Sequence, residues 1–159
     1  MRSKKAFLTV LVATSVLLCS CSKKEFSDDV DCDDIAEKIK SPALEYGEYD
    51  EEYLDFFFDA TTLQDDFCII YSNDVNDITE IGIFHTQNTD AAEELSAIAD
   101  NYISEMQKNQ RAFIGSYAPE ELPKLDSAEV KIFGNYVVYA ISDDNEALFA
   151  QVKDTLKMK

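Results

Sequence analysis

Val130-Lys131-Ile132-Phe133-Gly134-Asn135-Tyr136-Val137-Val138-Tyr139 is the stretch that decides the fold. Two runs rich in β-branched and aromatic residues flank the dipeptide Gly134-Asn135, a pattern typical of a hairpin with a two-residue turn. Such a turn makes Ile132 and Val137 direct cross-strand partners. One face of the hairpin is expected to lie in the core, and it carries Ala128, Val130, Ile132, Val137, Tyr139 and Ile141.

The same order of elements occurs earlier in the chain. An apolar strand is predicted over residues 67–71, turn residues rich in Asn and Asp follow it, and a second strand is predicted over residues 78–86. A polar cap and a long amphipathic helix come next. We therefore predict an α+β fold in which two β-hairpin-plus-helix units, residues 67–110 and 128–156, form an antiparallel four-stranded sheet.

Two shorter helices are expected before the first hairpin. Residues 31–40 and residues 51–59 each have one apolar side, and we predict that these N-terminal helices pack against the sheet. Residues 45–50 are acidic and contain Gly47, so they are predicted as a loop. Residues 60–66 are predicted as a connector.

The first residues have the pattern of an export signal. Arg2, Lys4 and Lys5 make a positive start, and residues 6–18 form an apolar run. A membrane-spanning helix needs about 20 apolar residues, so this run is too short to be one. The sequence predicts a signal peptide rather than a short core helix.

The end of that run, Leu18-Cys19-Ser20-Cys21, resembles the lipobox of bacterial lipoproteins. In that family the cysteine takes a diacylglyceryl group, and a peptidase with a narrow pocket cuts directly before it. Small Ser20 precedes Cys21, whereas bulky Leu18 precedes Cys19. The resemblance implies lipidation at Cys21 and a lipid-anchored protein at the extracytoplasmic face of the cell membrane.

This boundary sets the expected domain organisation. We expect a lipoprotein signal peptide over residues 1–20, a polar tether over residues 21–30 and a single α+β domain over residues 31–159. Hydrophobic residues make up 46% of the chain, which is enough for the core of one such domain.

The chain is strongly acidic, with a formal net charge of −18. Loss of the basic signal peptide would make this charge more negative still. Such a surface repels nucleic acid, so no nucleic-acid partner is expected. The expected partners are the membrane, through the lipid anchor, and a protein of the cell envelope.

Two cysteines remain inside the predicted domain, Cys32 and Cys68. A disulfide between them is one alternative outside the cytoplasm, and it would contribute about 3–4 kcal/mol. The other alternative is two separate buried thiols that act as small hydrophobic groups. Both residues lie on predicted apolar faces, so the sequence leaves both alternatives open.

A second resemblance extends over most of the chain. It is carried by Glu80-Ile81-Gly82-Ile83-Phe84, by Ser116-Tyr117-Ala118-Pro119-Glu120, and by Gly134-Asn135-Tyr136-Val137-Val138-Tyr139 with Asp143-Asp144 after it. Residues 31–157 resemble the small lipoproteins of Gram-positive, mostly clostridial bacteria that are grouped as domain of unknown function 4358. The resemblance implies an exported lipoprotein of this size and no catalytic residue.

The sequence contains few residue patterns that indicate a catalytic or ligand-binding site. His85 is the only histidine, so a serine or cysteine nucleophile would need it as a base. A lone histidine late in a strand is more often a surface or hydrogen-bonded side chain. Phosphate loops, dinucleotide-binding glycines, zinc spacing and HExxH motifs are missing from the sequence. We therefore expect no catalytic residue, no metal site and no cofactor.

Acidic residues gather around the start of the first predicted helix, at Asp28, Asp29, Asp31, Asp33 and Asp34. A calcium loop would need a turn glycine and a distal glutamate, and Asp34 and Lys40 stand in those places. We expect the cluster to keep the tether soluble and to cap the helix.

Phe56, Phe133 and Tyr136 fall on faces opposite the predicted core. Either they form an exposed patch, in which Phe133 and Tyr136 would meet a partner, or they pack under a neighbouring helix. The leading hypothesis is a non-enzymatic binding or interaction module at the cell envelope. A small envelope hydrolase and a small-ligand or cation-binding lipoprotein are the alternatives.

Overall fold

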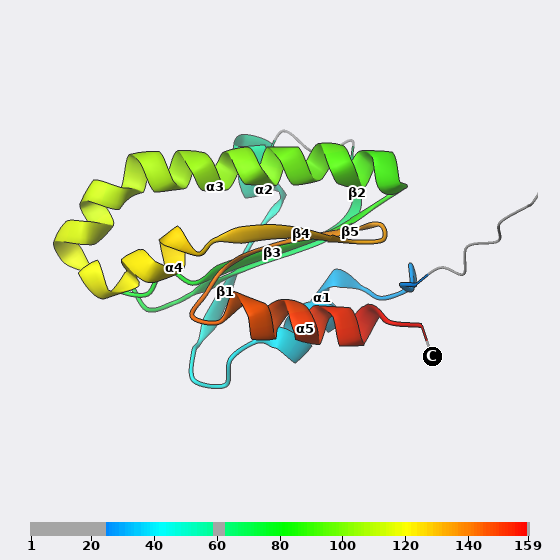
Figure 1. Ribbon diagram of the computed structural model, residues 1–159, viewed down its shortest axis with the longest axis horizontal. Helices are drawn as coiled ribbons and strands as arrows, with labels where there is room; N and C mark the ends of the chain where they lie inside the picture. The colour runs from blue at the N-terminus through cyan, green and yellow to red at the C-terminus, as the bar shows by residue number, and fades with distance from the viewer. Residues whose placement is uncertain (1–24, 59–62, 159) are drawn as a thin grey trace, which may run out of the picture.

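Helices cover both faces of a five-stranded sheet in the computed structural model, which describes residues 25–58 and 63–158 (Figure 1). The strands are β1 (Tyr46–Tyr49), β2 (Gln64–Ser72), β3 (Glu80–Thr86), β4 (Glu129–Phe133) and β5 (Tyr136–Ile141). The helices are α1 (Cys32–Ile39), α2 (Glu51–Phe58), α3 (Thr89–Tyr117), the 3-10 helix η1 (Pro119–Glu121), α4 (Leu122–Asp126) and α5 (Asn145–Leu156). The strand order is β1-β2-β3-β5-β4, and all neighbouring strands are antiparallel.

The two predicted hairpin-plus-helix units are confirmed. β4 and β5 pair in the predicted register, with Ile132 opposite Val137. Gly134 adopts the φ of 65° that the tight turn between them requires. β2 and β3 form the other hairpin, and β3 pairs with β5. Each hairpin leads into a helix, α3 or α5, whose first turn is capped by the side chain of Asn88 or Asp144.

The prediction of a four-stranded sheet is wrong, because the segment predicted as a loop contributes β1 at the edge of the sheet. Gly47, which indicated a loop, instead makes room for the ring of Tyr71 on β2. A β-carbon at residue 47 would lie far inside van der Waals contact with that ring. β2 is also longer than predicted and begins at Gln64. Both the formation of β1 and the early start of β2 depend on pairing with strands that are distant in the sequence, and the local sequence pattern does not show such pairing.

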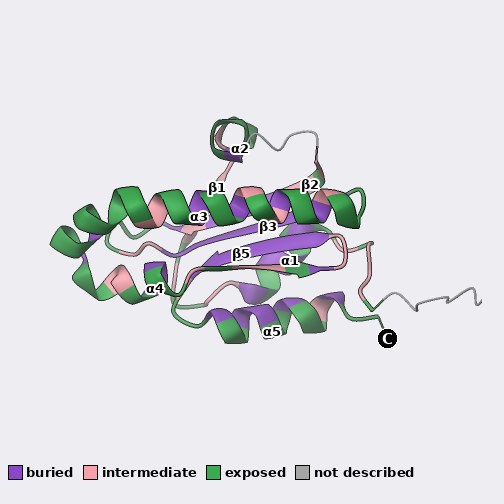
Figure 2. Ribbon diagram, turned by 45° about the horizontal axis from the view of Figure 1, so that its top comes forward, coloured by how far each residue is buried: buried purple, intermediate pink, exposed green. Residues whose placement is uncertain are grey.

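A core lies on each face of the sheet, and this corrects the exposed patch considered for Phe133 and Tyr136. One core packs the sheet against α1 and α5, and the other packs it against α2 and α3. Phe133 is 6% exposed and Tyr136 is fully buried, both in the core of α1 and α5. Figure 2 shows buried strand residues between the two helical layers. The sequence pattern indicated one inward face, whereas helices cover both.

Residues 25–30, part of the predicted tether, lie against the domain. The ring of Phe26 packs edge-on against Phe133, with 5.8 Å between the ring centroids. The carbonyl of Val30 accepts a hydrogen bond from the hydroxyl of Tyr136 at 2.7 Å. The ordered domain therefore begins before residue 31.

The predicted signal peptide, residues 1–20, and the predicted lipidation site, Cys21, lie outside the described residues. Within the described part of the chain, no helix combines the length and the apolar character that crossing a membrane requires.

Candidate functional site

Glu80 is a buried carboxylate at the start of β3. The residue is only 6% exposed, and the four residues that follow it in the strand are buried as well. Strand pairing places it opposite Tyr71 on β2 and Ile141 on β5. Burial of a charged group costs folding free energy unless hydrogen bonds compensate for the lost water. The partners of this carboxylate therefore define the site.

Two tyrosine hydroxyls donate to the same oxygen of Glu80. Tyr102 on α3 donates to Oε1 at 2.6 Å, and Tyr139 on β5 donates to it at 2.7 Å. The hydroxyl of Tyr53 on α2 lies 2.7 Å from the hydroxyl of Tyr102. A phenol carries one hydrogen, and that of Tyr102 is directed to Glu80, so Tyr53 is the donor to Tyr102. The Glu80 carboxylate on β3 is thus linked through hydrogen bonds to side chains on three other elements, α2, α3 and β5.

Burial raises the pKa of Glu80, and the hydrogen bonds from Tyr102 and Tyr139 offset part of this rise. The pKa values of the two phenols are also raised, first by burial and then by the nearby charge of Glu80. Both phenols therefore stay protonated and remain donors. The carboxyl group is the member of the network whose charge responds to pH.

A glycine on the neighbouring strand makes room for Tyr139. Gly82 is the direct cross-strand partner of Tyr139, and a β-carbon at residue 82 would overlap the tyrosine ring. Because residue 82 has no side chain, the ring lies across it and its hydroxyl reaches Glu80 two residues along β3. Gly47 makes room for Tyr71 in the same way on the other side of the sheet's centre.

A pocket of about 240 Å³ opens beside this network, and we call it the Glu80 pocket. Glu80 and Asp77 supply its two carboxylates, and none of its lining residues is basic. Its apolar surface comes from Tyr49, Tyr71, Met106, Phe113 and Ile114. Tyr49 stacks on Tyr71 with 4.2 Å between the ring centroids. The pocket is thus an aromatic and aliphatic hollow with a buried acid in its wall.

A neighbouring hollow of about 350 Å³ lies against α2 and shares Tyr49 with the Glu80 pocket. Its lining includes Phe56, which is 81% exposed, and Phe57, which is 46% exposed. Of the three aromatic residues that the sequence placed away from the core, Phe56 is therefore the one at the surface. This hollow has no buried charged group among its lining residues.

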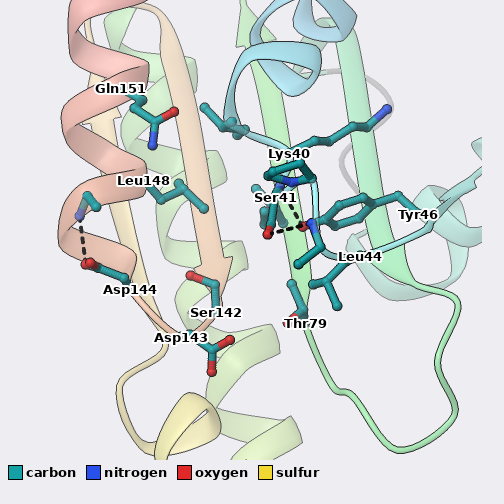
Figure 3. Close-up of a pocket in the computed structure, with 15 residues that line it drawn as sticks. Lys40, Ser41, Leu44, Tyr46, Thr79, Ser142, Asp143, Asp144, Leu148 and Gln151 are labelled. Carbon is teal, nitrogen blue, oxygen red and sulfur yellow. Dashed lines mark hydrogen bonds between the residues drawn. The ribbon is translucent and has the colours of Figure 1, made fainter.

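A larger pocket, of about 410 Å³, lies between the segment after α1 and the start of α5 (Figure 3). Several of its polar groups already have partners within the domain. Asp144 accepts a hydrogen bond from the backbone N–H of Ala147 at 2.9 Å and so caps α5. The hydroxyl of Tyr46 accepts one from the N–H of Ser41 at 3.2 Å. These groups hold loops and a helix end in place.

Lys124 is a buried cation that supports one wall of the Glu80 pocket. It is 5% exposed and lies 2.8 Å from Glu121 and 3.1 Å from Asp77. Burial alone would lower its pKa, but the hydrogen bonds with Glu121 and Asp77 raise it above the ordinary value. The network ties α4 to the turn between β2 and β3, which carries Asp77.

Cys32 and Cys68 are free and buried in the core of α1 and α5. Burial raises the pKa of both thiols. Atoms of Asp33, Glu48 and Cys68 lie within 4.8 Å of one another, the one such cluster of three metal-ligand types in the described part of the chain. Asp33 and Glu48 in this cluster are exposed, whereas Cys68 is buried in the core. Of the five acidic residues around the start of α1, only Asp33 belongs to this group.

His85 lies near the end of β3, away from the Glu80 pocket. Its ring centroid is 4.7 Å from that of Tyr136, and its Nε2 atom is buried without a hydrogen-bond partner among residues 25–58 and 63–158. It pairs across the strands with Asp66, which accepts a hydrogen bond from the N–H of Cys32 at 2.8 Å. A cysteine, a histidine and an aspartate thus gather, but the thiol is fully buried and its raised pKa disfavours the thiolate.

Sequence reasoning missed Glu80 as a site residue. The strand Glu80-Ile81-Gly82-Ile83-Phe84 was recognised, and its first residue is charged while the others are apolar or glycine. Tyr102 was predicted on the buried face of its helix, but as a core residue. The available signal was a charged residue at an inward position of a strand, Glu80, together with a tyrosine on the buried face of a helix, Tyr102.

A family model described as Domain of unknown function (DUF4358) matches residues 46–142. The matched segment contains every lining residue of the Glu80 pocket, whereas the pocket of Figure 3 extends beyond it at both ends. No curated protein and no solved structure matches the chain significantly.

Proposed function

The chain belongs to the family described as Domain of unknown function (DUF4358), and from that premise we propose a binding role. The protein is a non-enzymatic module that takes a small ligand in the Glu80 pocket. A lipid on Cys21 holds it at the extracytoplasmic face of the cell membrane, where an envelope protein is its expected partner.

The lipobox-like stretch that ends at Cys21 supports the anchor. The chain lies against the domain from Glu25 onward, through a hydrogen bond from the N–H of Met158 to the Glu25 carbonyl at 3.2 Å. The link from Cys21 to Glu25 would reach at most about 14 Å at ~3.5 Å per residue. The anchor would therefore hold the domain close to the membrane surface.

The position of Phe26 supports an orientation in which the Glu80 pocket points away from the membrane. Phe26 lies next to Gly134, in the turn between β4 and β5. The end of β3 is at the same end of the sheet, because the N–H of Thr86 donates to the carbonyl of Asn135 at 2.9 Å. Glu80 starts that strand, about 20 Å away at ~3.3 Å per residue.

The observation that carries the binding role is a nearly fully buried carboxylate in the wall of an apolar pocket. Ligand sites are typically apolar hollows with a few fixed polar groups. A group whose pKa is shifted inside a hollow marks a functional site more often than a surface charge does. Glu80 meets both conditions, since burial raises its pKa and it lines the pocket.

The anchor is tested by exchanging the sulfur of Cys21 for oxygen. The Cys21→Ser variant is expected in the soluble fraction or as an unprocessed precursor, because it offers no thiol for the lipid. Cys19→Ser is the matched control and should still sediment with membranes. A Cys21→Ser chain that is processed and sediments like the wild type would overturn the anchor.

The binding role is tested by a nuclear magnetic resonance screen of the full-length chain with small charged and neutral compounds. Hits should perturb the signals of Tyr49, Met106 and Ile114, which line the Glu80 pocket. A screen whose hits all map elsewhere, or that finds none, would overturn the role.

A further inference from the structure

We propose that the Glu80 pocket binds an alkylammonium group, the positively charged head of a small organic cation. This inference rests on the proposed binding role and names the chemistry of the ligand. The signs of the charges, the nature of the walls and the size of the pocket each support it.

The charges of the pocket favour a cation. Glu80 and Asp77 are its ionisable acids, and no basic side chain lines it. Asp77 already has a counter-ion, because Lys124 lies 3.1 Å from it. Among residues 25–58 and 63–158, Glu80 forms no ion pair, and its carboxylate accepts hydrogen bonds from two neutral phenols, Tyr102 and Tyr139. A bound cation would supply the missing opposite charge, and the net charge of −18 favours its approach.

The walls favour an organic cation over a metal ion. Calcium takes six to eight oxygen ligands, and magnesium demands near-ideal octahedral geometry. The Glu80 pocket offers mostly carbon surface, from Tyr71, Phe113 and Ile114 among others. Aromatic rings attract cations through their π faces, and methyl or methylene groups on an ammonium pack well against carbon. An alkylammonium group would pack its methyl or methylene groups against this carbon surface, whereas Tyr49, stacked between Tyr53 and Tyr71, has no free ring face.

The size of the pocket fits a single head group. Its volume of about 240 Å³ is below the ~300–1,000 Å³ that is typical for drug-sized ligands. Phe113, at the edge of the lining, is 60% exposed, so the remainder of a longer ligand has a way out to solvent.

The test compares choline with 3,3-dimethylbutan-1-ol, which has the same shape but carries carbon in place of the charged nitrogen. The full-length chain, purified in a mild non-ionic detergent, is titrated with each at constant ionic strength. Chemical shifts of the lining residues report binding. Choline is expected to bind at least about tenfold more tightly than the alcohol, which corresponds to about 1.4 kcal/mol.

Glu80→Gln keeps the shape of the side chain and removes its charge, so it should abolish the preference for choline. Glu94→Gln removes the same charge from an exposed position on α3 and should leave the preference unchanged. Equal binding of the two compounds by the wild type would overturn the cation inference while leaving the binding role intact. The wild-type comparison decides this even if Glu80→Gln fails to fold. Binding of neither compound at the lining residues would also overturn the cation inference, and the screen above then decides the binding role.

Discussion

The ring of Tyr139 lies across Gly82, its direct partner on the neighbouring strand, and its hydroxyl donates to Glu80 at 2.7 Å. The side chain that residue 82 lacks is what allows this contact. Gly82 therefore determines that Tyr139 can donate a hydrogen bond to the buried carboxylate of Glu80, two residues earlier in β3.

Gly82→Ala should displace the Tyr139 ring and destabilise the protein. Overpacking of a core typically costs about 1–3 kcal/mol, and the lost hydrogen bond to Glu80 adds to it. Urea denaturation measures the change in the free energy of unfolding. Gly115→Ala is the matched control, because a β-carbon there meets only Leu122, at 3.6 Å, and the residue lies within α3. The control should be neutral or stabilising by up to about 1 kcal/mol. Equal effects of the two changes would contradict the packing described.

Glu80→Gln should change how stability depends on pH. The pKa of the folded carboxyl is raised above its ordinary value of 4.5, so the folded state holds a proton that the unfolded state has lost. Stability of the wild type therefore falls as pH rises from about 4.5 through the folded pKa. The glutamine has no such fall, so its stability relative to the wild type should increase over this range. Urea denaturation at a series of pH values measures it, and a constant difference would contradict the raised pKa.

Lys124→Met should destabilise the domain strongly. It leaves Glu121 and Asp77 as partly buried carboxylates without their shared cation, and loss of one partner of a buried ion pair costs about 3–5 kcal/mol. Lys108→Met is the control, because its pair with Glu105 is exposed and its loss should leave stability almost unchanged. Thermal or urea unfolding compares them. A loss at Lys124 no larger than at Lys108 would contradict the buried network.

Cys32 and Cys68 should resist alkylation in the folded protein. Both thiols are buried and burial raises their pKa, so neither offers a thiolate to iodoacetamide. Intact mass after treatment should show both cysteines modified only when urea is present. Two cysteines that stay unmodified in urea until a reductant is added would instead indicate the disulfide considered from the sequence.

The strands around the turn at Gly134 were predictable because the turn type and the alternation of side chains are local features. The edge strand β1 was not, since four residues with a glycine in the middle carry no strand pattern of their own. Only the pairing of Gly47 with Tyr71 explains that glycine.

The candidate site was less accessible to sequence reasoning than the fold. Tyr53, Glu80, Tyr102 and Tyr139 lie far apart in the chain, and only the packing of α2 and α3 on the sheet brings them together. The sequence left the burial of Tyr136 as one of two alternatives for a related reason, because the pattern of one hairpin does not show whether helices cover both of its faces.

The most direct test of the account is a carbon NMR titration of the Glu80 carboxyl in the full-length chain, with and without saturating choline. Five tyrosines (Tyr49, Tyr53, Tyr71, Tyr102 and Tyr139) and the acid Asp77, which is paired with Lys124, are the titratable groups around it. The account predicts a pKa above 4.5 in the free protein and a clear fall when choline binds, because a cation favours the ionised carboxylate. A carboxyl that titrates at its ordinary pKa, or whose pKa choline leaves unchanged, would contradict it.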